Sequence, residues 1–505
     1  MKTLASILDN GLRNKSDTAL CDGERSFTFE DVNSEVEKIV DILTNKINPL
    51  DRIIVLAEKK VETIFLAIAI WKCGGVYCPI DVDLPEERRA SIVNNIQPAM
   101  VLSPSNLFDL LTSMPDVLSN RKEIGVEDAA IIIHTSGSTG TPKGVVLSHM
   151  SVVSYMESHS KVFDLNSDSR CFNTASFHYD VSIQDTFMPL YLGAYVYINN
   201  NFFIPSLILP VLKNEKISHL TIVSSVLTLI TLTEEELKSF NLDIRSISTG
   251  AELCEPETIN TWINSIDDLL VVNGYGPSEV NSATVSYKIR KDNAGVSSYY
   301  PIGFPNEGVL ERLISDKDEV ISLKNKRGEL VLGGNQIMMG YWSNPGATER
   351  AFIFIDGNKY YKTGDVCSYN DEGALVYHER LDFEVKINGR RINLLEISRL
   401  SSEILDIPSI KIGAVKNNNT TFIYLLIYSD DLAEKLFEDG IDRLLNELKI
   451  KFPDYMIPKV VVLAEDLKIT ASGKFNHKYY EDLIRSNNYK PLIDLTNEFS
   501  ERHFV

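Results

Sequence analysis

The sequence has few cysteines, and none of them forms a recognisable metal or disulfide pattern. The 505 residues include six cysteines, without a CxxC pair and without a Cys/His cluster at zinc-binding spacing. This argues against a disulfide-rich secreted fold and against a structural zinc site. We therefore expect buried, reduced thiols, as is usual in a cytoplasmic protein.

Long apolar runs and an excess of positive charge are missing as well. The longest apolar stretches, residues 64–71 and 202–212, are too short or too interrupted to span a bilayer, and the first nine residues turn polar too early for a signal peptide. Lys and Arg number 50 against 70 Asp and Glu, giving a net charge of −20. This balance argues against a non-specific nucleic-acid binder, although a locally basic pocket could still bind a nucleotide. We expect a cytoplasmic protein without membrane or nucleic-acid partners.

Short β-rich runs alternate with amphipathic stretches over about the first 380 residues. One example is a strand at 52–57, a helix at 60–72 and a strand at 76–80. Such alternation predicts an α/β fold with layered, largely parallel sheets covered by helices. After Asp382 the pattern changes to short strands (383–387, 409–415, 421–428) and helical runs (431–436, 440–452). We therefore expect a large N-terminal domain, 1–381, and a small α+β C-terminal domain, 382–505.

The strongest local signal is a loop rich in glycine and hydroxyl groups at residues 131–145, IIIHTSGSTGTPKGV. Glycines allow backbone N–H groups to turn toward an anion, hydroxyls add donors, and Lys143 adds a positive charge. The run does not satisfy the Walker pattern GxxxxGK[ST]. A flexible surface loop is the alternative, but nine residues without an apolar side chain directly after a β-run favour a phosphate-binding loop.

This loop resembles the signature of the adenylate-forming superfamily, which contains amino-acid adenylation domains, acyl- and aryl-CoA synthetases and luciferases. Further segments resemble the motifs of that superfamily and occur in the same order along nearly the whole chain. These segments are residues 27–32 (FTFEDV), 71–81 (WKCGGVYCPID), 273–279 (NGYGPSE), 328–342, 361–365 (YKTGD), 380–392, 453–458 (PDYMIP) and 470–474 (TASGK). About ten matches in order make coincidence negligible.

The resemblance implies that a carboxylate attacks the α-phosphate of ATP and that pyrophosphate leaves. Because an anion must approach a polyanion, the reaction needs Mg²⁺ and preorganised donors. The resemblance implies that Tyr275 stacks on adenine, that Asp365 accepts the ribose hydroxyls and that Glu279 ligates Mg²⁺. The implied ATP-binding residues are Thr135, Ser136, Gly137, Ser138, Thr139, Gly140, Gly250, Tyr275, Asp365 and Arg380. The implied catalytic residues are Lys143, Ser278, Glu279 and Lys474.

In this superfamily the small domain rotates about a hinge, here matched by Asp382, and exchanges an adenylation surface for a thiolation surface. Lys474 would stabilise the incoming carboxylate from the first of these surfaces. Carrier proteins that accept the product are typically acidic, so two acidic partners would repel each other. We therefore expect a local basic patch near the domain junction, formed by Lys386, Arg390 and Arg391.

The segment 177–188, FHYDVSIQDTFM, resembles the FDxSxxxxF motif of amino-acid adenylation domains. There the aspartate pairs with the α-ammonium group of the substrate, so Asp180 favours an amino acid; its alternative role is a helix N-cap. Tyr179 would be an aromatic gate beside that carboxylate. Alignment with such domains gives a pocket without acids or bases along its side-chain walls, which favours a small or medium neutral amino acid. The implied substrate-binding residues are Tyr179, Asp180, Val181, Gln184, Thr221, Ile247, Thr249, Gly274, Ser282 and Ala283.

The sequence thus predicts a free-standing ligase that forms an aminoacyl-adenylate from ATP and Mg²⁺, resembling adenylation domains of nonribosomal peptide synthesis and D-alanine–carrier protein ligases. No carrier segment follows Lys474, so we expect the aminoacyl group to pass in trans to the phosphopantetheine thiol of a carrier protein. Two alternatives remain: an acyl- or aryl-CoA ligase in which Asp180 has another purpose, and a catalytically inactive nucleotide-binding homologue. The joint presence of Lys143, Glu279, Asp365 and Lys474 argues against the inactive homologue.

Overall fold

The computed structural model describes residues 2–105, 107, 123–135, 142–252, 255–295, 299–381, 384–387, 389–407, 410–417, 420–428, 439–464, 468, 477–486 and 491–494. Contacts between Cα atoms divide the chain into two compact units. The first contains Met1–Val82, Val93–Thr135 and Lys143–Leu381, and the second contains the chain from Asp382 onward together with Asp83–Ile92. The helix α3 (Glu86–Ile96) is divided between them.

The largest sheet of the first unit, sheet A, has nine strands within the described residues, and six neighbouring strands in it run parallel. Antiparallel strands extend it at both edges. Its order is β14 (Phe304–Pro305), β13 (Val285–Ile289), β12 (Leu270–Tyr275), β11 (Ser246–Gly250), β10 (His219–Thr221), β8 (Arg170–Asn173), β9 (Tyr195–Ile198), β1 (Thr18–Cys21) and β2 (Ser26–Thr28).

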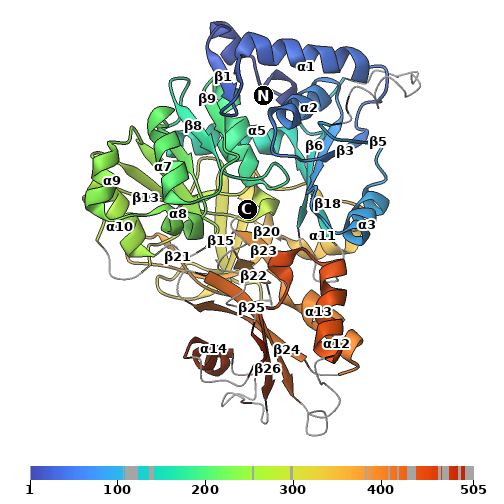
Figure 1. Cartoon of the computed structure of the whole chain (residues 1–505), viewed down its shortest axis with the longest axis vertical. Coiled ribbons are helices and arrows are strands. Elements are labelled where there is room, and N and C mark those ends of the chain that lie inside the picture. The colour runs from blue at the N-terminus through green and yellow to red at the C-terminus, as the bar shows by residue number, and fades with distance from the viewer. Residues whose placement is uncertain are drawn as a thin grey trace. The chain divides into compact units, whose positions relative to one another are not determined.

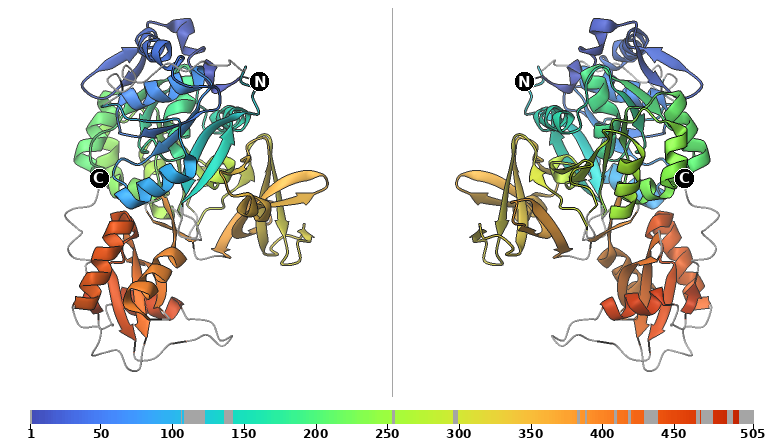
Figure 2. Two further views of the ribbon diagram at one scale, coloured as in Figure 1. Left: turned by 90° about the vertical axis from the view of Figure 1, so that its right-hand side faces the viewer. Right: turned by 90° about the vertical axis from the view of Figure 1, so that its left-hand side faces the viewer.

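Sheet B of the first unit is mixed, and sheet C is antiparallel throughout. In Figure 2 the strands of sheet C, in gold, form a group of their own beside the helix-covered sheets. Sheet B has the order β18 (Gly340–Tyr341), β7 (Lys143–Ser148), β6 (Ala129–Thr135), β4 (Val76–Ile80), β3 (Arg52–Leu56) and β5 (Met100–Leu102). Sheet C has the order β16 (Val320–Ile321), β15 (Val309–Ile314), β17 (Gly328–Gly334), β20 (Asn358–Tyr369) and β19 (Phe352–Ile355), with β21 (Leu375–Arg380) pairing to β20.

Helices cover both faces of sheet A, and the central strands are buried on both sides. On β12, Leu270 and Val272 belong to one hydrophobic cluster whereas Val271 belongs to another. Alternate residues of a strand point to opposite faces, so this division shows that both faces are packed, as parallel sheets require. Figure 1 shows α7–α10 gathered beside this sheet and α1 lying against α2. The helices are α1 (Phe29–Leu43), α2 (Val61–Lys72), α5 (His149–Val162), α6 (Met188–Leu192), α7 (Pro205–Asn214), α8 (Ser224–Ile230), α9 (Glu234–Phe240), α10 (Pro256–Ser265) and α11 (Pro345–Ala351).

The second unit is a small α+β assembly with its own core. Ile397 and Leu444 on two of its helices pack with Leu425 on its larger sheet, and all three side chains are buried. The smaller sheet pairs β22 (Glu384–Ile387) with β23 (Arg390–Asn393), and the larger has the order β24 (Ile410–Asn417), β25 (Thr420–Tyr428), β26 (Val460–Ala464) and β27 (Pro491–Asp494). Its helices are α12 (Leu394–Leu405), α13 (Asp439–Lys451) and α14 (His477–Arg485). The predicted α/β fold class with parallel sheets and helices is confirmed.

The cysteines and the helices bear on two expectations from the sequence. Five of the six cysteines lie in the described chain, where they are free thiols, and four of these are buried. Cys254 lies outside the described residues. No helix in the described part of the chain is long and apolar enough to cross a membrane.

Candidate active site

Several of the predicted site residues stand at the carboxyl ends of the strands of sheet A. Thr221, Gly250 and Tyr275 are the last residues of the neighbouring parallel strands β10, β11 and β12. Gly250 pairs with Gly274, which places the adenine side of the predicted site on adjacent strands. Ligands of open α/β sheets bind beyond these strand ends, because the strand-to-helix loops leave a crevice there.

Glycine is required at this edge because the two strands approach closely. A Cβ atom on Gly250 would lie 2.0 Å from the carbonyl oxygen of Gly274. A Cβ atom on Gly276, just after β12, would lie 1.5 Å from the carbonyl oxygen of Ser282. Both contacts are with backbone atoms, so no side-chain movement could relieve them, and larger residues at either position would displace the strand ends.

Asp365 lies at the centre of a buried polar cluster. Its strand β20 pairs with β21 so that Asp365 faces Arg380 across the ladder. Arg380 Nη1 donates to Asp365 Oδ1 at 2.8 Å, and the Tyr275 hydroxyl donates to Asp365 Oδ2. Burial raises the pKa of Tyr275, and the adjacent Asp365 raises it further, so the phenol remains a neutral donor. Three residues predicted to bind ATP are thus brought into direct contact.

A second cluster joins Glu279, Tyr341 and Lys143. Glu279, at 1% exposure, lies in the short 3-10 helix after β12, and Tyr341 is on β18, next to β7. The Tyr341 hydroxyl donates to Glu279 Oε1 at 2.7 Å, and Lys143 Nζ lies 5.3 Å from the centre of the Tyr341 ring. The Tyr341 ring therefore joins the predicted phosphate-binding lysine to the predicted metal ligand. The sequence motif at 340–342 contains this tyrosine, but nothing in the motif indicated its partner.

The residues of this cluster fit a magnesium ion bound together with phosphates. Mg²⁺ in nucleotide sites is usually held by one or two carboxylates, substrate phosphates and water, rather than by a complete protein cage. Glu279 offers such a carboxylate, and the described residues contain no group of three or more His, Cys, Asp and Glu that could form a cage. Glu279 is thus the residue of this cluster that could contribute a carboxylate oxygen to such an ion.

Asp180 stands at the start of the segment that leads into the π-helix Ile183–Phe187. Its carbonyl oxygen accepts a hydrogen bond from the Ile183 backbone at 2.9 Å, and its side chain is half-buried. Burial raises the pKa of Tyr155 on α5, and the charge of Asp180 raises it as well. Asp180 precedes by three residues the start of the π-helix that carries Gln184, another predicted pocket residue.

Hydroxyl groups and one amide line this pocket, and they bond to one another. Gln184 donates to Ser248 Oγ at 2.7 Å and to Thr221 Oγ1 at 3.3 Å, and it accepts from the Tyr155 hydroxyl at 3.0 Å. Ser224, the first residue of α8, and Thr249 on β11 form a hydroxyl pair at 3.2 Å. The sequence alignment included Gln184, Thr221 and Thr249 but missed the other three residues, which lie outside the recognised motif positions.

The remaining predicted pocket positions are divided between strands and loops: Gly274 is on β12 and Ile247 on β11, whereas Ser282 and Ala283 precede β13. A Cβ atom on Gly274 would lie 2.8 Å from Ala283 Cβ, so these two residues are close together. Ser282 adopts a left-handed backbone with φ of 64°. Ile247 is fully buried on β11, and Val181 is half-buried after Asp180.

Some predicted residues lie outside the described part of the chain. Thr135 ends β6 opposite Lys143 at the start of β7, but the loop between these two residues falls outside the described ranges. The predicted residues outside the described ranges are Ser136, Gly137, Ser138, Thr139, Gly140, Asp382 and Lys474. Ser278 is described and is half-buried beside Glu279.

The expected basic patch of the small domain is wrong at Arg391. Its guanidinium pairs with the buried carboxylate of Glu384, and the Arg391 side chain is only 17% exposed. Arg390 lies over the ring of Tyr455, 4.4 Å from its centre. At least one of the three charges is thus neutralised within the second unit, because β22 and β23 bring a carboxylate next to Arg391.

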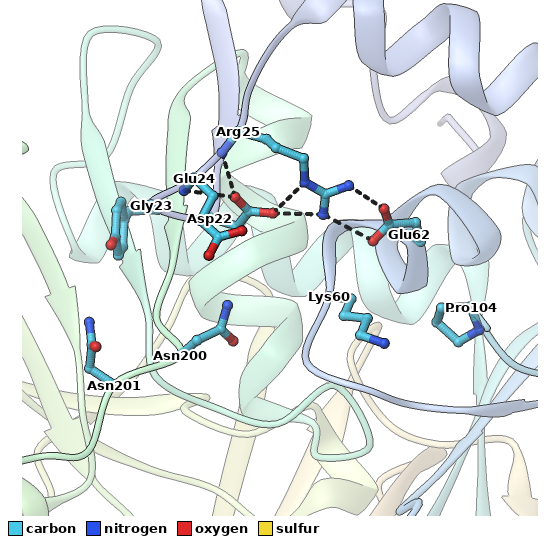
Figure 3. A pocket seen from close by; sticks show the side chains of 10 residues that line it. Asp22, Gly23, Glu24, Arg25, Lys60, Glu62, Pro104, Asn200 and Asn201 are labelled. Atoms are coloured by element: carbon cyan, nitrogen blue, oxygen red, sulfur yellow. Dashed lines mark hydrogen bonds and ion pairs between the residues drawn. The ribbon is translucent and has the colours of Figure 1, made fainter.

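A polar hollow elsewhere in the first unit contains none of the predicted site residues. It has a volume of about 690 Å³ and lies beside the ends of β1 and β9. Figure 3 shows Arg25 reaching between Asp22 and Glu62, with ion-pair distances of 2.7 and 2.6 Å. Arg25 is thus already paired with two carboxylates of the hollow.

The fold, the contacts among Asp365, Tyr275 and Arg380, and the hydrogen bonds of Gln184 can be set against known families. The family model described as AMP-binding enzyme matches residues 9–342. The chain therefore belongs to the AMP-binding enzyme family, and the superfamily predicted from the sequence is confirmed.

Curated relatives are multidomain peptide synthetases and one shorter biosynthetic protein. Over 91% of this chain, 26% of residues are identical to gramicidin S synthase 1 of Brevibacillus brevis, of which the chain covers 42%. Over 95% of this chain, 29% are identical to the dapdiamide synthesis protein DdaD of Enterobacter agglomerans, of which it covers 81%. The chain thus spans less than half of the first of these relatives.

Solved adenylation domains share the fold. The adenylation domain AlmE of Vibrio cholerae, solved with glycyl-adenosine-5′-phosphate, has a TM-score of 0.80 at 20% identity and matches 96% of this chain and 98% of its own. Holo-PA1221, which contains adenylation and carrier (PCP) domains of a nonribosomal peptide synthetase, has a TM-score of 0.81 at 20% identity and matches 95% and 84%. At these identities the two solved structures show that the chain has the fold of an adenylation domain.

Proposed function

We propose that this enzyme converts a small or medium neutral amino acid and ATP into an aminoacyl-adenylate and pyrophosphate. It then transfers the aminoacyl group to the phosphopantetheine thiol of a carrier protein presented in trans. The observation that supports the amino-acid assignment is the place of Asp180, whose carbonyl accepts from Ile183 at the start of the π-helix in which Gln184 is bonded only to uncharged hydroxyl groups. A carboxylate beside an uncharged pocket suits a substrate whose ammonium group is at its α-carbon.

Asp365 has the hydrogen-bonding capacity to hold the ribose. A carboxylate offers about two acceptor positions on each oxygen, and Tyr275 and Arg380 each occupy one position on different oxygens. One acceptor position per oxygen remains, which suits the 2′- and 3′-hydroxyls of a ribose. Because the Tyr275 hydroxyl is tied to Asp365, its ring is held in one orientation for stacking on the base.

The phosphate side would be organised by Glu279, Lys143 and the loop between β6 and β7. Glu279 would hold Mg²⁺, which supplies charge neutralisation for the transferring phosphoryl group when it is bound. The hydrogen bond from Tyr341 keeps the Glu279 carboxylate aimed in one direction. Lys143, close to the Tyr341 ring, would add a fixed positive charge near the phosphates.

The second half-reaction exchanges one acyl bond for another. The carrier thiol, after loss of its proton, attacks the carbonyl carbon of the aminoacyl-adenylate; a thioester forms and AMP leaves. Lys474 is proposed to act in the first half-reaction only, as a cation beside the substrate carboxylate. We place the activity in the cytoplasm, where ATP and carrier proteins are available. The glycyl-adenosine-5′-phosphate bound in AlmE is an adenylate of the proposed chemical class.

ATP–pyrophosphate exchange measured across a panel of L- and D-amino acids, fatty acids and aryl acids tests the first half-reaction. We expect exchange with one or more small neutral amino acids. In Asp180→Ala we expect the exchange rate with these amino acids to fall at least about a hundredfold, because the ammonium group of the substrate would lose its carboxylate partner. Asp168→Ala, on an exposed turn, is the matched control and should retain full activity. Exchange with a simple carboxylic acid but with no amino acid would support a CoA ligase and reject the amino-acid assignment.

The carrier step is tested by adding a separately purified carrier protein in its holo form. With the preferred amino acid and ATP, we expect the mass of the carrier to increase by one aminoacyl group, and the product to be released by hydroxylamine. An apo carrier, which lacks the thiol, is the control. Transfer to free CoA in place of the carrier would contradict the proposed partner.

A further inference from the structure

Gln184 is buried in the wall of the predicted amino-acid pocket, with 3% of its surface exposed. Both N–H groups of its amide are used, by Ser248 at 2.7 Å and by Thr221 at 3.3 Å. Its carbonyl oxygen accepts from the hydroxyl of Tyr155 at 3.0 Å. A glutamine amide has only two N–H donors, so Gln184 has no donor left for a ligand.

The partners of Gln184 are rigid. Thr221 and Ser248 are directly opposite each other on the parallel strands β10 and β11, so their hydroxyl groups are held by the sheet. Tyr155 is fully buried on α5, where its ring stacks on His159 with a centroid separation of 5.5 Å. The glutamine is therefore fixed by three elements that are far apart in the chain.

Gln184 lies in the π-helix Ile183–Phe187, four residues after Asp180. The hydrogen bond from Tyr155 therefore joins α5 to the element that directly follows the predicted ammonium-binding residue.

Resting on the proposed function, we infer that Tyr155 is a positioning residue that locks Gln184 across the end of the amino-acid pocket. The substrate is therefore an amino acid with a short, uncharged side chain, such as glycine, alanine or serine. A longer side chain would have to displace Gln184, and this would leave the hydroxyls of Tyr155, Ser248 and Thr221 without their partner. A substrate carboxylate gains no hydrogen bond from Gln184 in return, since both N–H groups of its amide are already used.

The test compares kcat and KM for alanine, valine and glutamine in ATP–pyrophosphate exchange. Tyr155→Phe removes one hydroxyl and keeps the ring, so Gln184 loses one of its three restraints. We expect the preference for alanine over valine, measured as the ratio of kcat/KM values, to fall about tenfold, which is the usual effect of losing one buried hydrogen bond. The change should lie mainly in the KM for the amino acids, with the KM for ATP unchanged.

Tyr191→Phe is the matched control. Tyr191 is also buried, and its hydroxyl donates to Glu157 at 2.7 Å, but it lies on α6 away from the pocket residues named above. Both variants lose a comparable hydrogen bond, so thermal unfolding of the two should change similarly. Only Tyr155→Phe should change the preference among amino acids.

A double-mutant cycle tests whether Tyr155 acts through Gln184. In the Gln184→Leu background the amide is absent, so adding Tyr155→Phe should leave the alanine-to-valine ratio unchanged. If Tyr155→Phe fails to fold, Ser248→Ala serves instead, because it removes the hydrogen bond on the other side of the Gln184 amide. We expect it to lower the alanine-to-valine ratio of kcat/KM values as well.

An unchanged ratio in Tyr155→Phe, or a wild-type enzyme that prefers a large amino acid, would overturn this inference while leaving amino-acid activation intact. Exchange without any amino acid in the panel would instead reject the proposed function.

Discussion

At the scale of single residues, Asp365 has the most sharply defined surroundings in the site. It is 4% exposed, and its two carboxylate oxygens receive a guanidinium and a phenol from different strands. A buried carboxylate is tolerated only where donors replace the lost water, and here two charged or polar donors do so. The same charge then remains available to an additional hydroxyl-bearing ligand.

Replacing Asp365 with asparagine removes the charge but keeps the shape. The amide offers one acceptor oxygen, so Arg380 or Tyr275 must lose its partner, and a ribose would meet fewer acceptors. We expect Asp365→Asn to raise the KM for ATP about tenfold or more, with a smaller effect on the KM for the amino acid. Asp371→Asn, in the exposed turn after β20, is the control. An unchanged KM for ATP in Asp365→Asn would contradict the nucleotide role of this cluster.

At the scale of elements, the helix α1 shows how local sequence determines both the start and the packing of a helix. Val32, Val36, Ile39 and Leu43 recur at a spacing of three or four residues and are buried. The helix begins with a complete capping box: the Thr28 hydroxyl accepts from the backbone of Asp31, and the Asp31 side chain accepts from the backbone of Thr28.

The capping box predicts a measurable contribution to stability. Thr28→Ala removes the hydroxyl that accepts from the backbone N–H of Asp31, which should lower the free energy of unfolding by about 1 kcal/mol. Thermal or denaturant unfolding of the intact chain measures this loss. Thr233→Ala removes the corresponding box of the shorter helix α9 and provides a comparison. Neither residue is among the predicted site residues, so we expect catalytic activity to persist in both variants. A Thr28→Ala protein with an unchanged free energy of unfolding would contradict the role of the cap.

At the scale of the whole molecule, four histidines are buried in the first unit. Burial lowers the pKa of His134, His149, His159 and His219 to about 4, below the ordinary value near 6.5. The folded protein therefore binds fewer protons than the unfolded chain between these two pH values. Their contribution to stability is present above about pH 6.5 and is lost as the pH falls through about 4.

We expect the melting temperature to fall steeply between pH 6.5 and pH 4, with each histidine contributing up to about 3 kcal/mol. His159→Phe should move the midpoint of acid unfolding to lower pH, because an aromatic ring of similar shape remains beside Tyr155 and Phe163 without a proton to bind. His378→Gln, at a partly exposed position, is the control. An acid midpoint that does not move in His159→Phe would show that other groups cause the loss.

Motifs that are continuous in the chain indicated the family from the sequence alone, and the alternation of strands and helices indicated the α/β class. Gly250 is required by a close backbone approach, whereas the nucleotide roles of Tyr275 and Asp365 remain predictions from their motifs. Motifs of this kind can be recognised in the sequence because their residues are contiguous and do not depend on contacts between distant parts of the chain.

Only the tertiary structure decided which residues meet across the chain. Tyr341 reaches Glu279 over a separation of 62 residues, and Tyr155 reaches Gln184 over 29. The pairing of Arg391 with Glu384, which contradicted the expected basic patch, likewise depends on the register of a two-stranded sheet. A hydrogen bond between distant residues depends on strand order, register and helix rotation, and the packing of the whole core determines these together.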